Sequence, residues 1–232
     1  MITERQNQIL NCLIKEYIKT AEPVGSDFLS KKYDFNLCPS ALRIEFQNLV
    51  KNGYLEQPHT SAGRIPTDKA YRYFVNNILE KENKERKKIE IIEKYINEFE
   101  IASRLTKYLA ESASIFSTLH FLNKQLYWQA GWEEISKEPE FNNQIFLTGF
   151  VNFLNDIEEK IKKLELNSQI NVFIGKEIPF PKTDNLSLIC SKCNFKESND
   201  ALIILIGPKR MNYDKNIHLM NSLNTFLEKI YE

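Results

Sequence analysis

Hydrophobic positions recur at helical spacing along the first twenty residues of the chain. The apolar side chains that would share one helix face are Ile9, Leu10, Leu13, Ile14, Tyr17 and Ile18. Thr3 can act as an N-cap with Gln6 three positions later, which is the pattern of a capping box. The following AEPVGS, residues 21–26, interrupts the pattern because proline and glycine are unfavourable inside helices. The pattern therefore predicts a helix over residues 3–20.

Two further short helices are predicted before residue 54. Ser26 can cap the first, DFLSKKY, and the loop DFNLCP follows it. The second begins with Pro39 in its first turn and ends at Gly53, a candidate C-terminal glycine. Its apolar stripe is Leu42, Phe46, Leu49 and Val50, and the other side carries Ser40, Arg43, Ile44 and Gln47. Because Ile44 is a branched apolar residue on that polar side, this side is a candidate contact surface, with an ordinary surface helix as the alternative.

The segment YLEQPHTSAGRIPT, residues 54–67, is rich in proline, glycine and small polar residues. It predicts a β-hairpin with YLEQ as the first strand, HTSAGR as the tip and IPT as the exit. Three short helices and such a hairpin indicate a winged helix-turn-helix, which would place the third helix in the major groove of double-stranded DNA. A solvated hairpin without a partner is the alternative.

Candidate DNA contacts follow from this interpretation. Arg43 could pair with a guanine edge, Gln47 with an adenine, and Ile44 could lie on a thymine methyl group. The hairpin tip offers hydroxyl groups, a glycine and an arginine, which suit the DNA backbone or the minor groove. The complete set of candidates is Ser26, Pro39, Ser40, Arg43, Ile44, Gln47, His59, Thr60, Ser61, Gly63, Arg64, Tyr71 and Arg72.

Composition restricts the possible partners only slightly. The 232 residues include 31 basic and 31 acidic side chains, so DNA binding would depend on a local basic patch. Residues 57–79 provide one, with Arg64, Lys69 and Arg72 against Asp68. The N-terminus lacks the features of a signal peptide and no window of 18 residues is uninterruptedly apolar, so we expect a cytoplasmic protein without a membrane partner.

Metal and catalytic motifs are weak. Cys190 and Cys193 form a C-x-x-C, but a structural zinc site needs four ligands, and Cys12 and Cys38 fall singly within apparent helices. The chain has no G-x-S-x-G, H-E-x-x-H, Walker or G-x-G-x-x-G motif. The IGPKRM sequence, residues 206–211, lacks the second glycine and the Lys-Ser/Thr ending of a phosphate-binding loop. We therefore expect no metal, no cofactor and no enzymatic activity.

The middle of the chain is densely charged from Glu80 to Glu100. Within it, Ile89, Ile92, Ile96 and Phe99 fall at heptad spacing. Two heptads are short for a stable coiled coil, so a dimerising helix and a helix that packs on its own domain both stay open. The next stretch, IASRLTKYLAESAS, is predicted to continue as a helix.

The C-terminal half has a mixed pattern of strands and helices. Buried strands are predicted for INVFIG (170–175), LSLIC (186–190) and ALIILIG (201–207). Residues 140–166 predict one long amphipathic helix, and MNSLNTFLEKIY a closing helix. The expected fold class is α+β, with a DNA-binding domain over 1–80, a charged linker over 81–114 and a sheet domain over 115–232.

Several motifs resemble the HrcA family of heat-inducible transcription repressors. ITERQNQIL, EPVGS and GYLEQPHTSAGRIPTDKAYRYFV carry the resemblance over residues 1 to about 80. It returns in EPEF (138–141), VFIGKE (172–177) and IGPKRMNYDKNIHLM (206–220). The resemblance implies a winged-helix domain joined to a GAF-like domain that contains an inserted dimerising segment. It further implies a homodimer that represses chaperone genes at an inverted-repeat operator and depends on a GroEL-type chaperonin.

This chain departs from the family in two places. Only residues 114–137 occupy the position of a longer stretch in typical members, so the inserted segment and part of the GAF-like sheet are expected to be absent. Where members resemble SPATIRNEM, this chain reads CPSALRIEF, so the family's threonine and asparagine positions become Ala41 and Ile44. A different operator sequence is therefore expected.

A second functional hypothesis is a winged-helix regulator that is gated by a small ligand in the GAF-like domain. The feature that would distinguish it is a polar-lined cavity within residues 115–232. The predicted strands there are almost wholly apolar and show no convergent polar set. The sequence therefore favours the repressor hypothesis.

Overall fold

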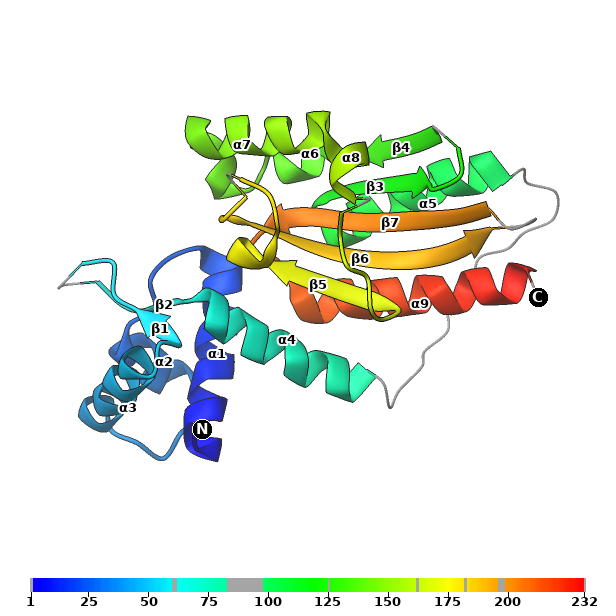
Figure 1. Ribbon diagram of the computed structural model, residues 1–232. Helices are drawn as coiled ribbons and strands as arrows, with labels where there is room; N and C mark the ends of the chain where they lie inside the picture. Colours follow the sequence, from blue (N-terminus) through cyan, green and yellow to red (C-terminus); the bar gives the residue numbers. More distant parts are fainter. Residues whose placement is uncertain are drawn as a thin grey trace. The chain divides into compact units, whose positions relative to one another are not determined.

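The computed structural model describes residues 2–59, 62–82, 98–124, 126–161, 163–181, 183–195 and 199–231. They belong to an N-terminal unit, Met1–Asn77, and a C-terminal unit, Ile78–Glu232 (Figure 1). The heptad positions Ile89, Ile92 and Ile96 lie outside the described residues. Within the described ranges, none of the helices has the length and apolar character that crossing a membrane requires.

The N-terminal unit contains three helices, a hairpin and the start of a fourth helix. The elements are α1 (Glu4–Thr20), α2 (Ser26–Lys32), α3 (Pro39–Lys51), β1 (Leu55–Glu56), β2 (Ile65–Pro66) and α4 (Asp68–Glu82). The predicted capping box of Thr3 and Gln6 is confirmed, because each side chain accepts a hydrogen bond from the backbone amide of the other. The predicted start of α3 at Pro39 is confirmed, and Gly53 follows it with a φ of 74°.

The core of this unit fixes the orientation of α3. The α1 side chains Ile9, Leu10, Leu13 and Ile14 are fully buried, as are Leu42 and Leu49 of α3. The side-chain amide of Gln6 also donates a hydrogen bond of 2.9 Å to the carboxylate of Glu45. The predicted apolar stripe of α3 therefore faces the core, and its other side is directed away from it.

A buried carboxylate joins α1 to the end of α2. Glu16 is 1% exposed and lies 2.6 Å from both the Lys32 ammonium and the Tyr33 hydroxyl. Burial by itself raises the pKa of Glu16, but the hydrogen bonds from Lys32 and Tyr33 outweigh it and lower the pKa. The hydrogen bond between Tyr33 and Glu16 raises the pKa of Tyr33 to about 12. The charged form of Glu16 is therefore the one that holds the two helices together.

The C-terminal unit is built on one five-stranded antiparallel sheet with the order β4-β3-β7-β6-β5. Its strands are β3 (Phe116–Phe121), β4 (Leu126–Ala130), β5 (Ile170–Ile174), β6 (Leu186–Phe195) and β7 (Asn199–Pro208). Its helices are α5 (Glu98–Ala113), α6 (Trp132–Ile135), α7 (Gln144–Asn155), α8 (Ile157–Ile161) and α9 (Tyr213–Tyr231), with short 3₁₀-helices at Pro139–Asn142 and Gly175–Glu177. The predicted α+β class is confirmed.

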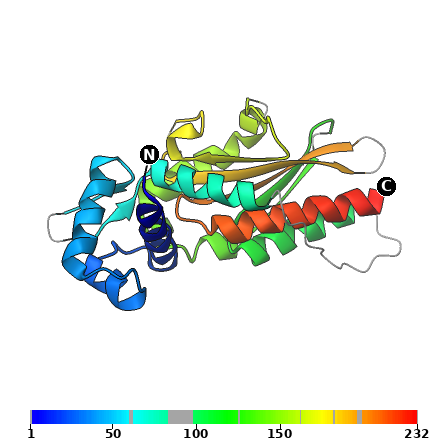
Figure 2. The same ribbon diagram turned by 90° about the horizontal axis from the view of Figure 1, so that it is seen from below.

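Helices cover both faces of the sheet. Helices α5 and α9 lie side by side against one face (Figure 2), where Phe99 packs edge-on against Phe121 at 5.9 Å. The other face carries Phe116, whose ring lies 5.5 Å from that of Phe150 on α7 and 4.9 Å from that of Trp132 on α6. Phe99, the last of the heptad positions, therefore packs on the sheet of its own unit.

The structure corrects one expectation for the middle of the chain. Residues 114–137, the stretch expected to be shorter than in typical family members, supply both β3 and β4. The long helix expected over 140–166 is instead a 3₁₀-helix followed by α7 and α8. The Asn143 side chain caps α7 by accepting from the amides of Ile145 and Phe146, and this cap separates α7 from the preceding turn.

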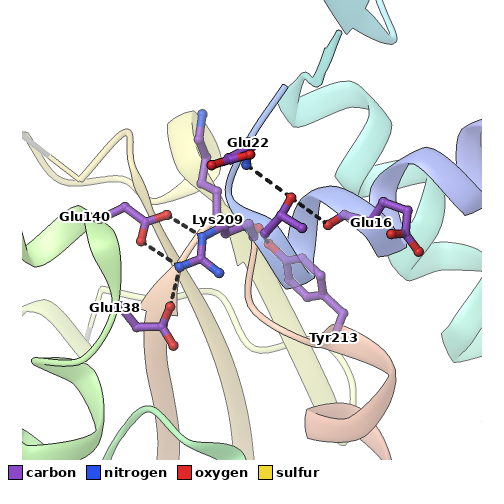
Figure 3. Close-up of polar contacts among 8 residues, drawn as sticks. Glu16, Glu22, Glu138, Glu140, Lys209 and Tyr213 are labelled. Atoms are coloured by element: carbon purple, nitrogen blue, oxygen red, sulfur yellow. Dashed lines mark hydrogen bonds and ion pairs between the residues drawn. The ribbon is translucent and has the colours of Figure 1, made fainter. Parts of the chain in front are cut away.

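Two motifs far apart in the sequence meet through Arg210. Its guanidinium donates hydrogen bonds of 2.7 and 3.0 Å to Glu140 and a further one to Glu138. Figure 3 shows the carboxylates of Glu138 and Glu140 directed to the same side. Burial lowers the pKa of Arg210, but the hydrogen bonds and charges of the two glutamates outweigh it and raise the pKa. The EPEF and IGPKRM segments are therefore held together by an ion-pair cluster.

Candidate nucleic-acid interface

One face of α3 presents polar and apolar side chains together to solvent. Ser40, Arg43, Ile44 and Gln47 are all exposed, and Ile44 is 59% exposed. The spacing of these positions places them on neighbouring turns of the helix, opposite the buried Leu42 and Phe46. The exposure of a side chain as large and apolar as that of Ile44 distinguishes this face from an ordinary polar helix surface.

The hairpin forms at the predicted place. Strands β1 and β2 pair antiparallel, with Leu55 opposite Pro66 and Glu56 opposite Ile65. The Gln57 side-chain amide donates to the Ala62 carbonyl at 3.1 Å and closes the loop. The predicted strand YLEQ is shorter in the structure, where β1 is only Leu55–Glu56, and the predicted exit IPT contains β2.

Gly63 is required for packing within the protein. Arg64 and Val24 exchange two backbone hydrogen bonds of 2.9 Å, which attach the hairpin to the turn between α1 and α2. A Cβ atom on Gly63 would lie 2.4 Å from the carbonyl carbon of Val24 and 2.7 Å from that of Pro23. The Gly63 backbone therefore lies directly against that of Val24, and a contact of Gly63 with DNA stays a prediction.

Two guanidinium groups act on each other between α3 and the hairpin. Burial lowers the pKa of Arg64, and the positive charge of Arg43 lowers it further. Arg64 donates to the carbonyls of Ala62 and Gly63 at 3.2 and 3.4 Å. Arg43 makes an exposed ion pair of 3.6 Å with Asp27, and pairs of this kind contribute little to stability. Arg43 can therefore exchange this partner for a nucleic acid at a small cost.

The remaining predicted contacts differ in their accessibility. Pro39 and His59 are exposed, Arg72 is half-buried, and Thr60 and Ser61 lie outside the described residues. Ser26 and Tyr71 are only 8% and 2% exposed, which leaves their side chains little surface for a direct contact. Ser26 begins α2 and Tyr71 lies in α4, and both side chains support the surface from inside.

Sequence reasoning assigned two other residues imperfectly. Lys69, counted in the basic patch, donates to the Asn52 carbonyl at 2.8 Å and lies 4.5 Å from the Tyr54 ring centre. It therefore caps the C-terminus of α3, where a cation is favourable. Cys38 is not inside a helix but is the exposed N-cap of α3, and a hydrogen bond from the Ser40 hydroxyl at 3.1 Å lowers the pKa of its thiol.

The C-x-x-C pair lies in β6. Residues three apart on a strand point to opposite faces of the sheet, so the Cys190 and Cys193 sulfurs are directed to different sides. Burial raises the pKa of both thiols, to about 12 for Cys193. In the described part of the chain, no group of three or more histidine, cysteine or acidic side chains is placed to hold a metal ion.

Comparisons with known proteins agree with the resemblance in the sequence. The family model described as the HrcA protein C-terminal domain matches residues 59–217. A heat-inducible transcription repressor HrcA of Carboxydothermus hydrogenoformans is 27% identical over 335 aligned positions, which cover 99% of this chain and 98% of the relative. Another, of Desulforudis audaxviator, is 51% identical over 81 residues, or 35% of this chain and 24% of the relative.

These comparisons also bear on the length and the fold. The alignment with the Carboxydothermus repressor spans 335 positions and this chain has 232 residues, so the relative contains a long stretch without a counterpart here. A crystal structure of a hypothetical protein superposes with a TM-score of 0.84 and 18% identity, covering 100% of this chain and 99% of that one. At this identity the likeness concerns the fold alone. Because the family model matches more than half of the residues of this chain, the chain belongs to the HrcA family.

Proposed function

We propose that the chain is a heat-inducible transcription repressor that binds double-stranded DNA through a winged-helix domain in its N-terminal unit. The observation that carries the proposal is the exposed face of α3, with Ile44 59% exposed beside Arg43. An α-helix fits the major groove, where arginine can recognise guanine and an apolar side chain can contact the thymine methyl group. The names of the relatives, heat-inducible transcription repressors, support the same function.

Base contacts and backbone contacts are assigned to different elements. Ser40, Arg43, Ile44 and Gln47 of α3 would face base edges. The hairpin, with Arg64 directly before β2, would contact phosphates or the minor groove. His59 and the tip residues Thr60 and Ser61 belong to the same proposed contact, with Arg72 beside it.

The two arginines should therefore respond differently to removal. Arg43→Ala is expected to weaken binding to the preferred site by ~1–3 kcal/mol and to relax the preference at one base pair. Arg64→Ala is expected to weaken all duplexes alike and to reduce the slope of log affinity against log salt by about one, because one fewer counterion is released. Fluorescence anisotropy with duplexes that carry single base changes, at several salt concentrations, measures both effects.

Arg104→Ala is the matched control for this pair. Arg104 is an exposed arginine on α5 in the C-terminal unit, paired with Glu100 at 2.7 Å. Its removal should change neither affinity nor salt slope. A uniform loss for Arg43→Ala would make Arg43 a phosphate contact and would remove the base contact from the proposal.

The proposal extends to assembly and regulation. We infer a cytoplasmic homodimer on an inverted-repeat operator of chaperone genes, because two linked half-sites bind more tightly than one. The C-terminal unit would be a reduced GAF-like domain. The proposed function involves neither a catalytic step nor a cofactor. A GroEL-type chaperonin would keep the repressor able to bind DNA. Operator binding should then decay on mild heating and return when the chaperonin is added; full activity of the isolated protein after heating would contradict this part.

A further inference from the structure

The C-terminal unit contains a cavity on the sheet. Its volume is about 450 Å³, which is within the ordinary range for small-molecule sites. It lies between the sheet and α8 with the segment that follows α8. Its lining includes His120, Lys124, Lys192, Ile161, Leu164 and Leu166.

The floor of the cavity is a row of side chains across four strands. His120 of β3 lies opposite Tyr127 of β4 and opposite Leu202 of β7, and Leu202 lies opposite Lys192 of β6. Residues directly opposite each other in antiparallel strands share a face of the sheet. The row therefore places a histidine and a lysine on one side of the sheet, although they are far apart in the sequence.

His120 supplies an uncharged polar group to this floor. It is 3% exposed, and burial lowers its pKa to about 4, so the imidazole is neutral at physiological pH. The Thr118 hydroxyl donates its proton to the Trp128 carbonyl at 3.1 Å and therefore accepts from Nε2–H of His120 at 2.8 Å. This arrangement leaves Nδ1 as the unprotonated nitrogen and fixes the ring, which also stacks on Tyr127 at 5.4 Å.

Only one of the two lysines at the cavity is neutralised by the protein. The Lys124 ammonium lies 3.2 Å from the Glu98 carboxylate and 5.1 Å from the Phe99 ring centre. Lys192 is exposed and has no acidic partner among the residues that the structure describes. Among the described residues that line the cavity, Lys192 is therefore the lysine without an ion-pair partner.

The wall opposite the floor is apolar. Ile161 is the last residue of α8, and Leu164 and Leu166 follow it. Leu122, directly after β3, and Leu126, the first residue of β4, line the cavity at that end of the sheet and not on the opposite wall. Leu122 and Leu126 are 41% and 43% exposed, which is unusual for large apolar side chains beside a cavity. A ligand with a hydrocarbon body would cover them.

We propose that this cavity binds an aliphatic monocarboxylate, with its carboxylate at Lys192 and its hydrocarbon chain along Ile161, Leu164 and Leu166. The Lys192 ammonium matches one negative charge, and the apolar wall gives the hydrocarbon chain a place away from water. This site is independent of the proposed DNA contacts, which all lie in the other unit.

The experiment is calorimetric titration of the full chain with octanoate and, separately, with 1-octanol. Octanoate is expected to bind one molecule per chain, and octanol about tenfold more weakly because it lacks the charge. Lys192→Met should weaken octanoate about tenfold and leave octanol unchanged. Lys107→Met, which removes a lysine side chain on α5 that is 75% exposed, is the matched control and should alter neither titration.

Three results would overturn the proposal. They are no octanoate binding at millimolar concentration, equal binding of octanoate and octanol, and unchanged octanoate binding by Lys192→Met. Because Lys192 is exposed, its replacement should leave the fold intact, and an unchanged thermal unfolding midpoint verifies this.

Discussion

Replacing Arg210 by Met is expected to lower the free energy of unfolding of the C-terminal unit by about 3 kcal/mol. The Arg210 side chain is only 9% exposed, and its removal leaves the carboxylates of Glu138 and Glu140 together without their cation. Breaking a buried pair typically costs about 3–5 kcal/mol. The glutamates are 23% and 26% exposed and can turn partly to water, so we expect the lower end of that range.

Tryptophan fluorescence during urea unfolding measures this effect selectively. The chain has two tryptophans, Trp128 and Trp132, and both belong to the C-terminal unit. Arg104→Met, which breaks an exposed pair, should change stability by less than about 1 kcal/mol. Adding Glu138→Gln and Glu140→Gln to the Arg210 variant should recover part of the loss, because no unpaired carboxylate then remains. Equal stability of the single and triple variants would contradict the role of charge.

Gly63→Ala is expected to detach the hairpin from the rest of the N-terminal unit. The added methyl would lie 2.4 Å from the carbonyl carbon and 2.5 Å from the carbonyl oxygen of Val24, and backbone atoms cannot move aside as a flexible side chain can. Overpacking of this kind costs about 1–3 kcal/mol. Because the displaced hairpin carries Arg64, binding to DNA should fall about tenfold or more.

Gly25→Ala provides the matched control, since a Cβ there would have no neighbour within 4 Å. Hydrogen exchange of the Val24 and Arg64 amides reports the hairpin directly, because each donates to the other's carbonyl at 2.9 Å. Gly63→Ala should abolish the protection of these two amides, and Gly25→Ala should keep it. Retained protection together with full DNA affinity would refute the packing role of Gly63.

Local signals in the sequence were sufficient for most of the N-terminal unit. The capping box at Thr3, the proline that begins α3 and the glycine that ends it each act within a few residues, so the sequence alone predicts them. The outward direction of Ile44 follows equally from helical periodicity. The role of Gly63 could not be predicted, because it depends on the backbone of Val24, which is distant in the sequence.

The C-terminal unit was less predictable because its contacts are non-local. Strand β3 is buried along its whole length, so it shows no alternation of polar and apolar residues, and its pairing with β7 joins distant segments. The helical pattern of apolar residues runs through residues 140–166 without interruption. The start of α7 depends instead on a single side-chain cap, Asn143. His120 and Lys192 meet in the cavity only through the register of the strands between them.

Selection of binding sites from random double-stranded DNA tests the central claim most directly. The purified protein should enrich one sequence, arranged as an inverted repeat, and the Arg43→Ala variant should lose the preference at one position of each half-site. We expect the enriched DNA sequence to differ from the operators of other family members at the base pairs that face Ala41 and Ile44. Failure to enrich any sequence above non-specific binding, with the protein folded, would contradict recognition of DNA by α3.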